Sequence, residues 1–190
     1  MRKYIFTAVL LMLVFLSACT PPSSEREEIK QIIEKELGIN PYIPDDDLIG
    51  AVIMNYYHAL DNNSDAGKGD PFQVEIEYKA STEEKLDEKM KEVWDDRDPL
   101  REVVYGDLYM DPNVCKVTIF KDGVPEIMAA ELIELEGHEV QYQYIERDSE
   151  AVIMAIDFEE YGYMIEYYLE EGRTEEDAQV FAEDIIRNID

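Results

Sequence analysis

Three oxygen-bearing side chains in the middle of the chain have the spacing of a calcium loop. Asp61, Asn63 and Asp65 alternate within the segment DNNSDAGKGD, and Ca²⁺ binds carboxylate and amide oxygens that lie close together in sequence. The pattern is incomplete, because Phe72 stands where the bidentate glutamate of such a loop belongs. A displaced turn that adds Asp70 as a ligand would restore the site. A polar loop without a metal accounts for the same composition.

A single cysteine near the N-terminus indicates a second kind of chemistry, lipid attachment. Arg2 and Lys3 precede an apolar segment, residues 4–18, which is shorter than the ~20 residues of a membrane-spanning helix. The sequence LSAC that ends at Cys19 resembles the lipobox of bacterial lipoproteins. This resemblance implies that residues 1–18 are a signal peptide, that Cys19 is acylated, and that residues 19–24 are a Pro/Ser tether. Two acyl chains would hold the protein on the bilayer.

Aromatic side chains crowd the C-terminal part of the chain, where Tyr168 is a candidate ligand-binding residue. In an extended strand, alternate residues face the same side, so Met164, Glu166 and Tyr168 would form one surface while Tyr163 and Tyr167 pack beneath helices. Such a surface is suited to a peptide or a glycan. Packing of β-prone aromatic residues is the alternative explanation.

Recognisable catalytic patterns are missing from the sequence. His58 and His138 are the only histidines, and neither has the local ligand spacing of a zinc site. With 45 Asp and Glu residues, carboxylate pairs of the glycosidase type arise by chance. We therefore expect a protein that is not an enzyme. An envelope hydrolase that uses a carboxylate pair is the third-ranked alternative.

The chain is strongly acidic, with a formal net charge of −28. A negative surface repels nucleic acid and anionic polymers and concentrates cations around it. This charge argues against a nucleic-acid partner. It suits adaptation to salt or high pH, and also an electropositive partner.

Hydrophobic periodicity predicts one α+β domain over residues 25–190: an antiparallel meander sheet of about six strands, packed by two to three helices. Helices are predicted after Ser24, Ser81 and Thr174, each followed three residues later by Glu or Asp as in a capping box. Cys115 alternates with apolar neighbours and is predicted to be a core residue. Two strands are predicted at residues 48–57 and 72–79. The six strands of the meander are predicted at residues 103–110, 114–121, 127–135, 139–146, 150–158 and 163–169. For residues 48–57 a buried helix is the alternative, because an unbroken apolar run fits either structure.

The C-terminal segment AVIMAIDFEEYGYMIEYYLEEGRTEEDAQVFAEDIIRNI resembles a domain of unknown function found on cell-surface lipoproteins of bacilli. In that family an aromatic-rich strand and a T-x-E-E motif lead into a closing amphipathic helix. The resemblance implies a fold and a location. It carries over no catalytic residue.

Together these features predict a non-catalytic, lipid-anchored binding or sensing lipoprotein on the extracytoplasmic face of a Gram-positive cell membrane. Its expected partners are the membrane, through the anchor, and a protein or glycan of the envelope. A calcium- or cation-binding surface module is the second-ranked function, and calcium is the only cofactor that the sequence suggests.

Overall fold

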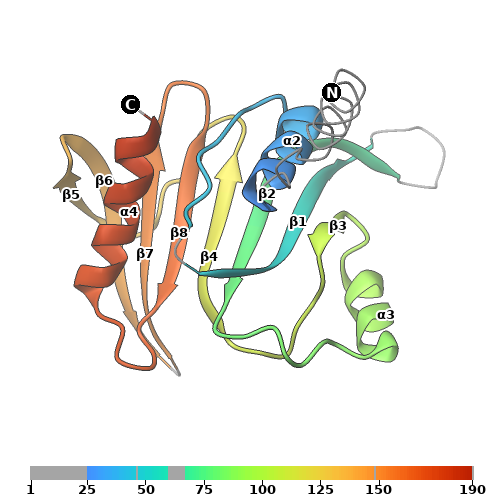
Figure 1. Ribbon diagram of the computed structural model, residues 1–190. Coiled ribbons are helices and arrows are strands. Elements are labelled where there is room, and N and C mark those ends of the chain that lie inside the picture. The colour runs from blue at the N-terminus through green and yellow to red at the C-terminus, as the bar shows by residue number, and fades with distance from the viewer. Residues whose placement is uncertain (1–24, 46, 60–66, 148, 190) are drawn as a thin grey trace, which may run out of the picture.

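The structure is a computed structural model that describes residues 25–45, 47–59, 67–147 and 149–189. Three helices and eight strands follow one another along this part of the chain (Figure 1). In order, they are α2 (Glu25–Leu37), β1 (Leu48–His58), β2 (Lys68–Lys79), α3 (Glu88–Arg97), β3 (Arg101–Gly106), β4 (Asn113–Phe120), β5 (Glu131–Leu135), β6 (His138–Glu146), β7 (Glu150–Asp157), β8 (Gly162–Tyr168) and α4 (Glu175–Ile189).

All eight strands form one antiparallel sheet in the order β3-β1-β2-β4-β8-β7-β6-β5. The α+β class is therefore confirmed. The expected number of about six strands is wrong, because β1 and β2 join the same sheet as the six later strands. The expected continuous meander is also wrong, since β3 pairs with β1 and β4 pairs with β8. Among the six later strands, only β5 to β8 pair in sequence order, and β1 pairs with β2 in the other half of the sheet.

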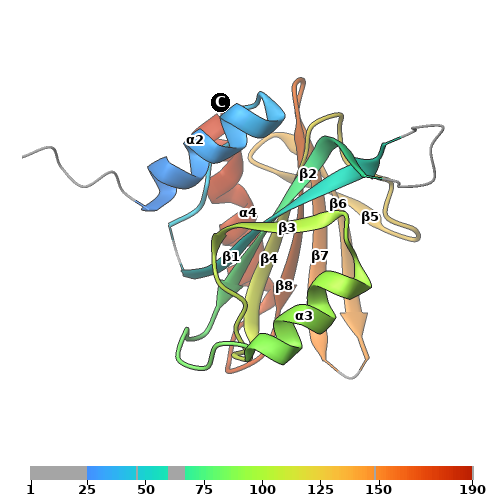
Figure 2. The same cartoon turned by 90° about the vertical axis from the view of Figure 1, so that its right-hand side faces the viewer.

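Helices cover the two faces of the sheet unequally. Helices α2 and α4 lie on one face, and α3 lies beside β3 on the other (Figures 1 and 2). Strand β1 contributes to both sides: Val52 and Met54 belong to the main core, whereas Ala51 and Ile53 pack against the α3 side. Cover on both faces explains the unbroken apolar run of β1, and the strand prediction for this segment is confirmed over its helical alternative.

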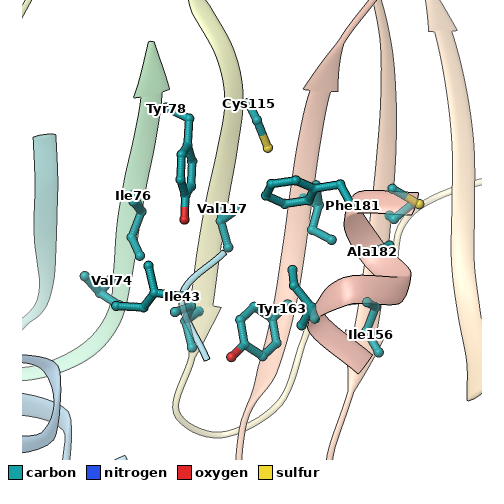
Figure 3. Packing of buried hydrophobic residues seen from close by; sticks show 14 of the residues in the cluster. Ile43, Val74, Ile76, Tyr78, Cys115, Val117, Ile156, Tyr163, Phe181 and Ala182 are labelled. Carbon is teal, nitrogen blue, oxygen red and sulfur yellow. The ribbon is translucent and has the colours of Figure 1, made fainter. Parts of the chain in front are cut away.

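The main core lies between the sheet and the pair α2 and α4 (Figure 3). Phe181 of α4 is 3% exposed and packs against the rings of Tyr78 and Tyr167, with ring centroids 5.9 Å apart in both pairs. Cys115 is fully buried in the same core, as predicted. Helix α4 begins as the capping box requires, because the Asp177 nitrogen donates to Thr174 Oγ1 and the Thr174 nitrogen donates to Asp177 Oδ2.

Buried tyrosine hydroxyls hold the segment that connects α2 to β1. The hydroxyl of Tyr163 donates to the carbonyl of Tyr42 at 3.0 Å, and that of Tyr78 donates to the carbonyl of Pro44 at 3.3 Å. A buried loop needs donors for its carbonyl groups, and a tyrosine supplies one while filling the core. Core packing is therefore the role of Tyr163 and Tyr167, as strand alternation predicted.

The helix predicted after Ser81 begins later than expected. Asp87 caps α3 by accepting a hydrogen bond from the Met90 nitrogen at 2.8 Å. Ser81 and Glu84 do not form a capping box, because the Ser81 hydroxyl and the Glu84 nitrogen both donate to the Asp111 carboxylate. The sequence pattern for this helix start was therefore misleading, since the better acceptor lies far away in the chain.

One aspartate fixes α3 to the turn that follows β3. Asp107 lies 2.8 Å from Lys91 Nζ and 3.0 Å from Lys85 Nζ, and it also accepts from the Leu108 nitrogen. These hydrogen bonds, that of Lys91 most strongly, lower the pKa of Asp107 to about 2. The carboxylate is therefore ionised over the whole physiological pH range and keeps both lysines in place.

Candidate functional site

The structure places only some of the candidate site residues. Cys19, Asp61, Asn63 and Asp65 lie outside the described residues, so lipidation and the calcium loop stay predictions. Asp70 lies on β2, with an exposed side chain. Among the residues that the structure describes, no group of three or more His, Cys, Asp or Glu side chains is arranged to hold a metal ion.

Met164, Glu166 and Tyr168 project from β8 on the side away from α2 and α4. Their neighbours Tyr163 and Tyr167 are buried in the main core, and side chains alternate along a strand. All three candidates are half-buried. The shared surface that the alternation predicted is therefore present, and its role in ligand binding stays a prediction.

This surface is the centre of the less covered face of the sheet. On one side, α3 packs only near β1 and β3. On the other side, the connection between β4 and β5 crosses β6: the Ile127 nitrogen donates to Gln141 Oε1 at 2.8 Å, and Gln143 Nε2 donates to the Met128 carbonyl at 3.1 Å. We call the part between them, on β2, β4, β8 and β7, the open face.

Four charged side chains form an ion-pair network across the open face. Arg101 of β3 binds Glu75 of β2 at 2.9 Å, and Lys116 of β4 binds Glu166 of β8 at 2.6 Å. Lys116 Nζ also lies 3.9 Å from Glu75 Oε2, which joins the two pairs. The Tyr168 hydroxyl lies 3.5 Å from Glu166 Oε2 and extends the network along β8.

The network is partly removed from water, and Trp94 of α3 covers only its Arg101 end, where the guanidinium carbon lies 4.9 Å from the centre of the indole ring. The side chains of Arg101, Glu75, Lys116 and Glu166 are only 14–27% exposed. Burial raises the pKa of Glu75 above its ordinary value against the opposing effect of Lys116 and Arg101. Burial alone would lower the pKa of Lys116, but Glu166 and Glu75 outweigh it and the pKa is raised. Polar interactions are stronger in such surroundings than in bulk water.

A buried amide beside the network lacks a hydrogen-bond partner. Asn55 of β1 is 9% exposed and lies opposite Arg101 in the β1–β3 pairing. Its Nδ2 atom is one of the few buried side-chain atoms without a partner in the described part of the chain. Buried polar groups in folded proteins nearly always have a hydrogen-bond partner, so an unpaired buried donor is a rare feature.

Chemically, the open face offers carboxylate acceptors, two kinds of cationic donor and an aromatic ring. These groups can exchange hydrogen bonds with hydroxyl, amide and carbonyl groups of a polar ligand. The sequence suggested Glu166 and Tyr168 but missed Glu75, Lys116 and Arg101. Their polar positions in alternating strands were a usable signal. What brings them together is strand pairing, which the sequence pattern does not reveal.

Comparison with known proteins found no matching family model, no matching curated protein and no matching solved structure. Within the ranges that the structure describes, none of the helices has the length and apolar character needed to cross a bilayer.

Proposed function

We propose that this protein is a non-catalytic binding lipoprotein, anchored through Cys19 on the extracytoplasmic face of a Gram-positive cell membrane. In this proposal it belongs with the lipoproteins of bacilli that its C-terminal segment resembles. The open face is its ligand surface, and the ligand is a peptide or glycan of the envelope.

The proposal of ligand binding rests on the unequal cover of the two faces of the sheet by helices. One face buries the core under α2 and α4, whereas the open face keeps a charged, partly desolvated network next to Tyr168. Glu166 and Tyr168 lie within reach of each other and combine an acceptor with an aromatic surface, as ligand sites do.

The start of the domain supports the anchoring part. Helix α2 begins at Glu25, so residues 20–24 alone separate the domain from Cys19. A tether of that length reaches at most about 17 Å. The domain would therefore lie close to the bilayer, at the boundary between membrane and wall.

Metabolic labelling with an alkyne fatty acid tests the anchor. The full chain, expressed with its leader in a Gram-positive host, should incorporate the label, and Cys19→Ala should abolish it. Cys115→Ala is the control, because this buried thiol is not the expected acceptor and its loss should leave labelling intact. An unlabelled wild-type chain would refute lipidation.

Sedimentation with wall sacculi freed of anionic polymers tests the ligand surface. The full chain in detergent should co-sediment, and Tyr168→Ala should weaken binding about tenfold, as expected for losing an aromatic contact worth about 1.4 kcal/mol. Tyr57→Ala is the matched control, because Tyr57 is 54% exposed on another part of the surface. Equal retention of both variants, or no retention of the wild type, would contradict the proposal.

A further inference from the structure

A surface depression of about 420 Å³ lies at the β5–β6 edge of the sheet, where α4 begins. Tyr142, which packs against the main core, and Glu175 of α4 form its helix side, and none of its lining residues belongs to the open face. An inference about it therefore does not depend on the ligand proposed above. Its lining residues come from three separate segments and are Ala129, Glu131, Tyr142, Gln143, Tyr144 and Glu175.

Two tyrosine rings form the aromatic part of the depression. Tyr142 and Tyr144 are alternate residues of β6 and so project to the same side. Tyr142 lies opposite Glu131 in the β5–β6 pairing, and its hydroxyl donates to Glu175 in the first turn of α4. This hydrogen bond fixes the ring. Tyr144 is 39% exposed, so its ring is accessible from solvent.

The charged groups that act on both tyrosines are carboxylates. Burial first, and then Glu175 and Glu131, raise the pKa of Tyr142. Burial first, and then Glu150, Glu146 and Glu175, raise the pKa of Tyr144. Both phenols therefore stay neutral at physiological pH, and the depression combines two electron-rich rings with an excess of negative charge. In contrast, the carboxylates of the open face are paired with Lys116 and Arg101.

We infer that this depression is a binding site for an organic ammonium group, which is either a protonated amine or a quaternary ammonium group. Such a cation is attracted to the faces of tyrosine rings and loses little hydration when it contacts them. The carboxylates of Glu131 and Glu175 supply the counter-charge at the wall of the same depression. Anionic ligands are repelled by these carboxylates.

The strongly acidic surface adds to this preference. A net charge of −28 raises the local concentration of every cation around the protein. Small inorganic cations hold their water tightly and gain little from an aromatic ring. Aromatic surface is thus the feature that selects an organic cation from the surrounding ion atmosphere.

Equilibrium dialysis of the full chain in detergent against radiolabelled choline, at constant ionic strength set with NaCl, tests the site. The wild type should bind choline saturably, and Tyr144→Ala should weaken binding by at least about tenfold. Tyr144→Phe, which keeps the ring, should bind within about twofold of the wild type. Tyr57→Ala, which removes an exposed tyrosine elsewhere, should bind as the wild type does.

A neutral analogue of choline and a charge variant of the protein test whether binding depends on the attraction between a positive ligand and the carboxylates of the depression. The neutral isostere 3,3-dimethylbutan-1-ol should fail to compete with choline, because it lacks the positive charge, and effective competition would overturn the inference. Glu175→Gln should weaken choline binding while leaving the circular dichroism spectrum unchanged. Unchanged affinity in both Tyr144→Ala and Glu175→Gln would overturn the site. So would an absence of saturable uptake of both choline and butylammonium by the wild type.

Discussion

Replacing Gly106 with Ala is expected to destabilise the protein by about 3 kcal/mol or more. Gly106 has a φ of +75°, in the left-handed region that costs other residues about 1–2 kcal/mol. It also ends β3 against β1, where an added Cβ would lie 2.1 Å from the Gly50 carbonyl oxygen. That oxygen accepts a hydrogen bond from the Asp107 nitrogen at 2.9 Å. The strands would have to separate, and the anchorage of α3 through Asp107 would be lost with them.

Gly137→Ala is the matched control for this substitution. Gly137 has a similar φ of +82°, but nothing lies within 4 Å of an added Cβ. In urea unfolding, the Gly137→Ala variant should lose about 1 kcal/mol of stability, which is the cost of the backbone conformation alone. The difference between the two variants measures the close approach of β3 to β1. Equal losses would show that this approach relaxes freely and would contradict the prediction.

Phe181→Ala is expected to destabilise the protein by about 3–5 kcal/mol, because it removes a buried aromatic ring from a closely packed core. The ring touches Tyr78 of β2 and Tyr167 of β8, so it connects α4 to two strands that β4 separates. A loss of this size should lower the thermal midpoint by on the order of 10 °C for a protein of this length.

The neighbouring Val180→Ala provides the control on the same helix. Val180 is 54% exposed, so its truncation should change stability by no more than about 0.5 kcal/mol. Both variants introduce alanine into the same helix. They therefore differ mainly in how deeply the removed side chain was buried. A Phe181→Ala midpoint equal to that of Val180→Ala would show that α4 is not part of the cooperative core.

Residue patterns within short segments predicted the helices and most strands. The order of the strands and the start of α3 depend instead on contacts between segments that are distant in sequence. Thr174 and Asp177 cap α4 as expected, because both partners of that motif lie within one turn. Ser81 was misleading because Asp111, distant in sequence, accepts the hydrogen bond from the Glu84 nitrogen that a capping box would direct to the Ser81 oxygen. The number of strands that share one sheet was underestimated, and the meander was misjudged, for the same reason. Strand order depends on which edges meet, and hydrophobic periodicity contains no information about that.

The candidate sites divide in a similar way. Strand alternation alone places Glu166 and Tyr168 on one surface. Glu75 and Lys116 reach that surface only through the register of β2 with β4 and of β4 with β8. The contact between Tyr142 and Glu175 joins a strand to a helix and could not be predicted from either segment.

The pairing of β4 with β8 has a kinetic consequence. Strand β4 ends at Phe120, and β8 begins only at Gly162, after β5, β6 and β7 have passed. While the chain is being made, β1 to β4 can pair with one another, but the free edge of β4 stays unpaired and its apolar side chains lack α4. A sheet that closes through such distant residues has a high contact order and folds slowly, and an open apolar edge promotes aggregation in the interval. The rate at which β5 to β8 fold back onto β4, rather than the strength of any single contact, therefore sets how long the chain is exposed to misassembly.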